Sequence, residues 1–225
     1  MTTALPHADE PMAVLETRLA HGVHRTATTL LAEAAPRPSV PLGALAQLRD
    51  FLVENLRHHH ETEDHDLWPR IVAASPAAAQ GLDALSEEHV RLDAALDRLA
   101  AVAIGDDSTP AGAGTADDEV RAALHGAAAA VRDAIHDHLG HEEPILFPAL
   151  RDHVSPEQWQ DFSQKVIATT PPVAGHLMIG FLDEVGTPAE VAQMLAALPE
   201  PLHPLIPALR LQAAEDLRVL RGSGS

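Results

Sequence analysis

Apolar residues recur at helical spacing along the first two thirds of the chain. Four stretches are long and periodic enough to predict helices: residues 10–34, 42–73, 77–104 and 117–150. Clusters of proline, glycine and small polar residues separate these stretches, at residues 36–41, 75–76 and 105–115. The pattern therefore predicts an all-α protein in which four helices pack as a bundle.

The last third of the chain differs, because prolines interrupt its short apolar pieces at positions 171, 172, 188, 199, 201, 204 and 207. We expect three parts: a bundle over residues 10–153, a helical extension over residues 154–221 and a disordered tail over residues 222–225. Ser155 is the predicted N-cap of the first helix in the extension, and Asp117 that of the fourth bundle helix.

Composition and charge agree with this fold class and exclude several partners. Aromatic residues make up only 3% of the chain and tyrosine is absent, which disfavours strands. The 15 basic and 33 acidic residues give a net charge of −18, which would repel nucleic acid and anionic membranes. The chain shows neither a signal peptide nor an apolar run of the roughly 18 residues that a membrane span needs, so we expect a cytoplasmic protein.

The absence of cysteine and tyrosine restricts the metal chemistry that the chain can support. Without cysteine there is no disulfide, no thiolate nucleophile and no thiolate-bound zinc or iron–sulfur cluster. Any bound metal must be held by histidine, aspartate, glutamate or water.

An internal repeat carries the strongest chemical signal. Residues 59–69 and 138–148 both fit the pattern H-x3-E-[DE]-x2-L-[WF]-P, and the matches are offset by 79 residues, from position 59 to 138. Each match follows a predicted helix with an isolated interior histidine, His24 in the first half and His89 in the second. The chain thus repeats a helix pair, with a longer connection before the fourth helix.

The motif suits a metal site because residues i and i+4 lie on one helix face with Cβ atoms about 6 Å apart. His59 with Glu63, and His138 with Glu142, can therefore each present one imidazole and one carboxylate inward. The second and fourth helices would supply carboxylates able to bridge two ions. The large aromatic residue of each motif would close the pocket, and proline would end or bend the helix.

These motifs resemble those of the hemerythrin-like, or HHE cation-binding, domains. The resemblance covers roughly residues 10–153 and implies an up-down-up-down bundle around a non-haem centre of two iron ions. Two carboxylates and an oxo or hydroxo group would bridge the ions. The candidate metal ligands are His24, His59, Glu63, His89, His138, Glu142 and Asp93.

The chain departs from the oxygen-carrying members of that family at two positions. Those members have H-x3-H on the third helix and a bridging aspartate, whereas this chain has Asp93 after His89 and Glu142 as its second carboxylate. Loss of one imidazole disfavours reversible dioxygen carriage. It favours a more open, carboxylate-rich site, as in bacterial relatives whose roles involve iron, peroxide, nitric oxide or redox sensing.

Several side chains keep more than one interpretation. Asp93 fits a metal ligand, an acceptor for an imidazole N–H or an ordinary surface residue. On a helical wheel, His21 lies near the direction of His24, and His141 near that of His138. Each could therefore contact a metal ligand from outside, or bind the metal in place of the missing imidazole. His58 and His60 are explained by a polar helix face. On a helical wheel, His125 and His136 point well away from the direction of His138, so we expect both side chains to be solvated.

Three functions remain after these exclusions. The first is a di-iron protein that reacts with or senses peroxide, dioxygen or nitric oxide, and whether it turns over as an enzyme stays open. The second is a metal- or redox-responsive binding module that acts on a protein partner through residues 154–221. The third is a purely structural helical protein.

Overall fold

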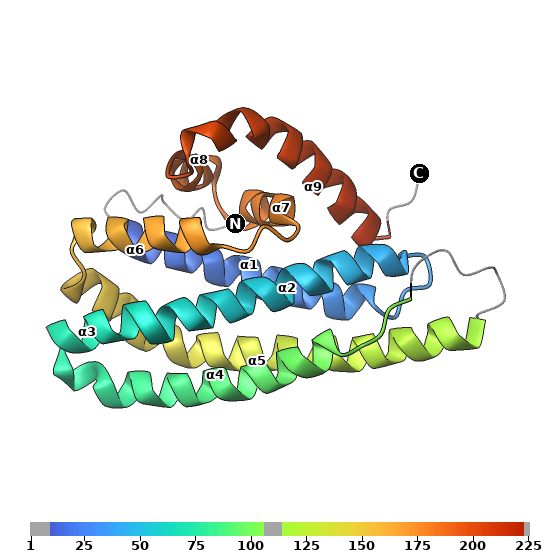
Figure 1. Cartoon of the computed structure of the whole chain (residues 1–225), viewed down its shortest axis with the longest axis horizontal. Coiled ribbons are helices and arrows are strands. Elements are labelled where there is room, and N and C mark those ends of the chain that lie inside the picture. The colour runs from blue at the N-terminus through green and yellow to red at the C-terminus, as the bar shows by residue number, and fades with distance from the viewer. Residues whose placement is uncertain (1–9, 106–113, 223–225) are drawn as a thin grey trace, which may run out of the picture.

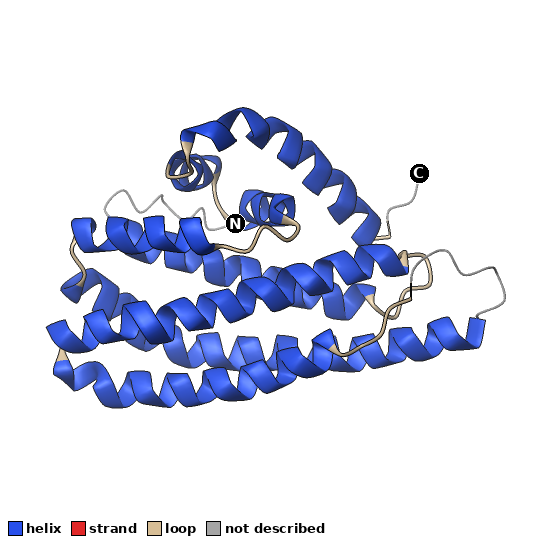
Figure 2. Ribbon diagram, viewed as in Figure 1, coloured by secondary structure: helices blue, strands red, loops and turns tan. Residues whose placement is uncertain are grey.

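The computed structural model describes residues 10–105 and 114–222, and every regular element in these two ranges is helical (Figure 1, Figure 2). Four long helices run side by side along the molecule: α1 (Met12–Ala34), α2 (Leu42–Thr62), α4 (Ala79–Ala100) and α5 (Gly114–His153). Helix α1 contacts α5, α5 contacts α4, α4 contacts α2, and α2 contacts α1, which closes the ring. The predicted four-helix bundle is confirmed.

Two clusters of buried apolar side chains fill the bundle, one on either side of a polar layer. Along α4, Leu85 belongs to one cluster and Leu92 to the other, with the buried His89 between them. The same change of cluster occurs along α5 between Leu139 and Leu146. Each fully buried leucine contributes about 1.5–3 kcal/mol relative to an exposed one. These clusters therefore hold the four helices in register around the polar layer.

The second helix continues beyond α2 in a way that the sequence did not reveal. A π-helical segment, η1 (Glu63–Leu67), follows α2 directly and leads into α3 (Trp68–Ala74). The helical path ends at Ala74, close to the predicted end at residue 73, and Pro69 does not end it, because this proline lies in the first turn of α3, where a missing N–H is tolerated. The wide turn of η1 falls on the acidic residues of the first motif, and such π-segments are frequent at functional sites.

The fourth bundle helix also differs from the prediction at its start. Helix α5 begins at Gly114, so Asp117 lies in its first turn and is not its N-cap. Pro144 and Pro148 lie inside α5, and the predicted kink beside Pro144 stays a prediction. The predicted breaker at residues 105–115 falls mostly outside the described residues.

The extension forms a second layer on the α1 and α2 side of the bundle (Figure 1). Its elements are a short 3-10 helix, η3 (Glu200–Leu205), and four α-helices: α6 (Pro156–Thr169), α7 (Gly175–Val185), α8 (Pro188–Ala196) and α9 (Ile206–Leu220). Ser155 caps α6 through a reciprocal capping box with Gln158, as predicted. Gly180 lets α7 approach α9, because a Cβ there would lie 2.7 Å from the Cβ of Ala213.

The predicted boundaries between bundle, extension and tail stay a prediction. Of the predicted tail, only Gly222 lies within the described residues. In that described part of the chain, no helix is long and apolar enough to cross a membrane.

The loop between α1 and α2 is held by one buried side chain of α5. The Arg121 guanidinium donates to the carbonyl oxygens of Arg37 at 2.8 Å and Val40 at 2.7 Å. The Arg37 carbonyl also accepts from the backbone N–H of Val40 at 3.1 Å, so the cation adds a charged donor there and supplies one to the buried Val40 carbonyl.

We expect Arg121→Met to lower the free energy of unfolding by about 2 kcal/mol, because charge-assisted hydrogen bonds are lost and the buried carbonyl of Val40 loses this donor. Urea denaturation followed by circular dichroism measures this change. Arg91→Met is the matched control, since the Arg91 side chain is 67% exposed and should change stability by no more than about 0.5 kcal/mol. Equal stability of the two variants would contradict the anchoring role.

Candidate metal centre

Buried histidine and glutamate side chains meet in the polar layer as two adjacent groups. The first group is His60, His89 and His138, and the second is His21, His59, Glu63 and Glu142. Within each group the possible ligand atoms all lie within 4.8 Å of one another. All four bundle helices and η1 contribute, so the groups exist only once the bundle has formed.

The two glutamates each place one oxygen toward each group. Glu63 Oε1 lies 3.3 Å from His59 Nε2, and its Oε2 lies 3.7 Å from His89 Nε2. Glu142 Oε1 lies 3.7 Å from His21 Nε2, and its Oε2 lies 3.2 Å from His138 Nε2. Two carboxylates that each face both groups can bridge a pair of neighbouring cations.

The donor atoms of this layer lack ordinary hydrogen-bond partners within the protein. Leaving a buried polar atom unpaired costs about 1–3 kcal/mol, and such atoms are few in native cores. Here they gather in one place: His21 Nε2, His24 Nδ1, His59 Nε2, His60 Nε2, Glu63 Oε2 and both carboxylate oxygens of Glu142. In addition, His89 Nε2 and His138 Nε2 face each other at 3.1 Å. Nitrogen and oxygen donors in this arrangement fit cations, which would satisfy all of them at once.

Outer carboxylates orient the imidazoles from behind. Glu143 Oε1 lies 3.1 Å from His21 Nδ1 in hydrogen-bond geometry, and Asp64 Oδ2 lies 3.0 Å from His89 Nδ1 as an ion-pair contact that is not aligned as a hydrogen bond. A carboxylate at Nδ1 holds the proton there, which leaves the Nε2 lone pair free to point inward.

The repeat explains these outer carboxylates, because Asp64 and Glu143 are the second acids of the two E-[DE] pairs. The first acid of each pair points into the layer, and the second reaches across to a histidine on a neighbouring helix. His138 has a comparable partner from α4, since its Nδ1 lies 2.9 Å from Glu88 Oε2.

Burial sets the protonation of the metal-free groups. Together with the charge of neighbouring histidines, burial lowers the pKa of His24 to about 3 and of His89 to about 4. These imidazoles are therefore neutral at neutral pH, the form that ligates metals.

The two glutamates titrate as a pair. Burial raises the pKa of Glu63 well above its usual value, and the adjacent charge of Glu142 raises it further. Burial also raises the pKa of Glu142, but His21 and His138 outweigh it and leave this pKa lowered. The metal-free pair thus favours a proton on Glu63, and cation binding would displace it.

The structure brings five of the seven predicted ligands into the two groups: His59, Glu63, His89, His138 and Glu142. His24 belongs to neither group, although its ring lies 4.6 Å from that of His59 and its Nδ1 has no partner. His21, one turn earlier on α1, lies in the second group instead. The assignment of ligands stays a prediction, and the geometry adds His21 to the candidates.

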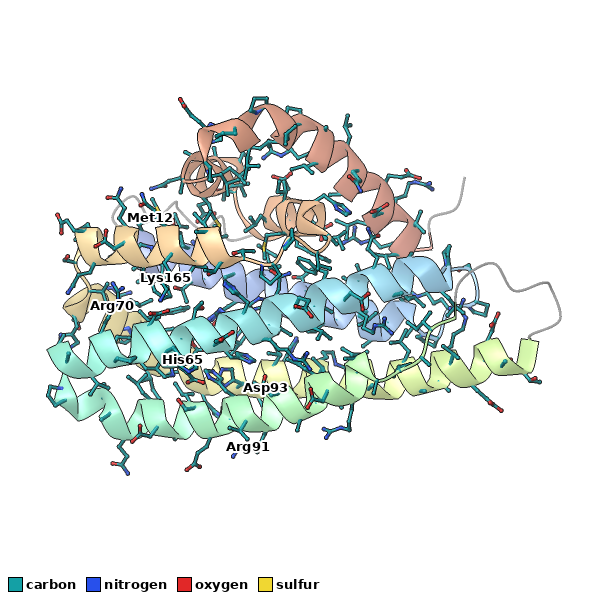
Figure 3. All side chains as sticks on the ribbon, in the orientation of Figure 1. Met12, His65, Arg70, Arg91, Asp93 and Lys165 are labelled. Carbon is teal, nitrogen blue, oxygen red and sulfur yellow. The ribbon has the colours of Figure 1, made fainter. Side chains whose placement is uncertain are left out.

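Asp93 lies apart from the centre. Its side chain is 51% exposed, and its Oδ1 lies 3.8 Å from His60 Nδ1 (Figure 3). Of the three interpretations of Asp93, the geometry favours an outer partner for an imidazole.

His60 is the candidate that the sequence pattern misplaced. It was expected on a polar helix face, yet it is buried and its ring stacks on that of His89 with centroids 4.4 Å apart. His141 has a side chain that is 66% exposed and bonds to Glu88. His125 and His136 lie exposed and away from both groups, as predicted.

Fold and site together define a helical bundle built to hold cations with nitrogen and oxygen ligands. Residues 15–150 match the family model of the hemerythrin HHE cation binding domain. The chain belongs to this family. Comparisons with curated proteins and with solved structures found no match.

The first prediction from the site concerns the pH dependence of the metal-free protein. Four buried imidazoles have a lowered pKa in the folded state: His24, His59, His60 and His89. Below their unfolded pKa of about 6.5 the unfolded chain binds more protons at these four positions, so folding stability falls as pH falls. The raised pKa values of Glu63 and His138 act in the opposite direction but involve fewer protons.

We therefore expect the melting temperature of chelator-treated protein to drop between about pH 6.5 and pH 5, where most other carboxylates stay ionised. Differential scanning calorimetry measures this drop. His89→Gln should make the dependence shallower, while His136→Gln should not. A melting temperature that is constant over this range would contradict the neutral, buried state of the imidazoles.

The second prediction tests the outer carboxylates. Asp64→Asn should lower metal affinity by about 10- to 100-fold, because His89 loses the anion that orients it. Asp66→Asn is the matched control, since Asp66 lies on the same π-segment and pairs with Lys165 of α6, not with an imidazole (Figure 3). Competition titration against a chelator gives both affinities, and equal values would exclude the orienting role.

Proposed function

We propose that this protein holds two iron ions in the two groups and reacts with or senses peroxide, dioxygen or nitric oxide. One observation carries the proposal: Glu63 and Glu142 each turn one oxygen toward each group of imidazoles. A single cation cannot use both oxygens of both carboxylates in this arrangement, whereas a bridged pair can.

The donor set supports iron over the common alternatives. Structural zinc takes four ligands, usually with cysteine, and magnesium or calcium takes oxygen ligands almost alone. Here the two groups together offer five imidazoles and two carboxylates that face both groups, a set that suits iron. Iron ions bound there would supply one-electron redox chemistry and open coordination positions for a small oxidant.

The chain's own residues shape this site in three ways. The outer acids hold protons on the far nitrogens of His21 and His89, which fixes the direction of each ring. The aromatic residues of the two motifs stack on these same rings, Phe147 on His21 at 5.9 Å and Trp68 on His89 at 6.2 Å. The apolar clusters bound the layer on either side along the bundle.

The second candidate function is a metal-responsive binding module that acts through the extension without turnover. It is favoured by the packing of α6 and α7 on α1, the helix that carries His21 and His24. Peroxide consumption by iron-loaded protein separates the two candidates, because a binding module would not turn over.

The proposal predicts two irons per chain, since each group has its own imidazoles and shares both carboxylates. Glu63→Ala and Glu142→Ala should each abolish the paired centre, because each glutamate serves both ions. Iron analysis with the absorbance of an oxo-bridged centre tests this, and His136→Ala is the control that should keep both ions. One zinc per chain with no uptake of iron, or full iron content in both glutamate variants, would refute the proposal.

A further inference from the structure

A cavity of about 790 Å³ lies between the bundle and the extension. Its floor comes from α1, α2 and η1, and its walls from α6, α7, α8 and α9. The walls are largely apolar and include Phe162, Val166, Met178, Met194 and Leu209. Sites for small organic molecules have volumes of about 300–1,000 Å³ and mainly apolar linings, so this cavity has the size and lining of one.

The cavity reaches the candidate metal centre on one side only. His24, His59 and Glu63 all line it, and so does Thr62 of α2. None of the three imidazoles of the first group, His60, His89 and His138, is among its lining residues. A molecule in the cavity would therefore meet the second group and not the first.

Several polar groups around the cavity are already paired within the protein. The carboxylate of Glu16 accepts hydrogen bonds from Trp159 Nε1 at 2.8 Å and Ser163 Oγ at 2.9 Å. His176 Nε2 lies 2.8 Å from Asp216 Oδ2. At the floor, by contrast, His24 Nδ1 and His59 Nε2 have no partner. A ligand would find apolar contacts along much of the walls, and buried polar atoms without a partner at the floor.

Charge restricts the ligand further. No lysine or arginine is among the described residues that line the cavity, while Glu16 and Glu63 are. An anionic head group would find no counter-charge from the protein, and a cationic one would have to give up its hydration inside an apolar chamber. A neutral molecule avoids both costs.

We propose that this cavity binds a neutral, mainly apolar organic molecule that carries one hydroxyl or carbonyl group, with that group turned toward His24, His59 and Glu63. The cavity depends on the extension, because most of the residues in the cavity walls lie beyond residues 15–150, the range that matches the family. Binding in the cavity does not depend on metal. Only the contact between the polar end and a bound ion rests on the function proposed above.

The experiment uses 1-dodecanol as the probe and dodecanoate as its anionic match, with metal-free and iron-loaded full-length protein. Trp159 lines the cavity, so its fluorescence reports binding, and isothermal titration calorimetry gives affinity and stoichiometry. We expect one dodecanol per chain in both forms, bound at least about tenfold more tightly than dodecanoate to the metal-free form.

Two tryptophan substitutions on α9 form a matched pair. Leu209→Trp fills the cavity and should weaken binding by at least about tenfold, whereas Leu211→Trp should not, since Leu211 is 76% exposed. Met194→Phe, which narrows the cavity from α8, provides a second, milder variant. Circular dichroism and iron content should be unchanged in every variant.

Each result decides a separate part of the proposal. No binding of dodecanol, or equal binding by Leu209→Trp and Leu211→Trp, would overturn the cavity site. Tighter binding of dodecanoate to metal-free protein would overturn the neutral class of ligand. A dodecanol-induced shift in the absorbance of iron-loaded protein would support the contact at the floor. If dodecanol binds but the protein takes up no iron, the proposed function fails while the cavity site stands.

Discussion

Two glutamates buried at the centre of an apolar bundle are the constraint on which the structure depends. A carboxylate away from water is costly unless it is paired, protonated or bound to a cation, and Glu63 and Glu142 are close enough to share a proton. Four helices must converge to surround them with imidazoles, and the apolar clusters on either side stabilise that convergence. The fold thus holds a polar layer that is incomplete by itself, which is how structural stability and cation binding become coupled.

The sequence predicted the helices and the inward pairs of each motif because both follow from one periodicity along a single helix. His59 with Glu63, and His138 with Glu142, needed no tertiary information. The choice between His21 and His24 did, because residues three apart share a helix face and only the rotation of α1 against its neighbours separates them. His60 was misplaced for a different reason. The helical-wheel estimate assumed one inward direction, whereas two groups side by side let adjacent residues of α2 serve different groups.

The two halves of the repeat depart from regular α-helical hydrogen bonding at corresponding points. In the first half, η1 begins at Glu63, and backbone bonding widens just after the inward glutamate. In the second half, Pro144 follows Glu142 by two residues and cannot donate its own backbone hydrogen bond. Both features disturb the regular series of backbone hydrogen bonds beside the glutamate. The π-segment does so by inserting a residue, and the proline by removing an N–H donor. The sequence showed the proline but not the π-turn, since no residue type specifies a π-turn in the way that proline specifies a missing donor.

The extension covers only one side of a centre whose inward pairs, His59 with Glu63 and His138 with Glu142, are repeated in the two halves of the chain. An ion held by His21 and His59 would border a chamber, while an ion held by His60, His89 and His138 would be sealed among helices. The two ion positions would thereby be kinetically unequal. The chamber-side ion would be the first to exchange and the first to meet any incoming molecule. The sealed ion would act as its electronic partner, so the extension would add to a difference already present in the donors, since His21 and His60 have no histidine counterpart in the other half of the repeat.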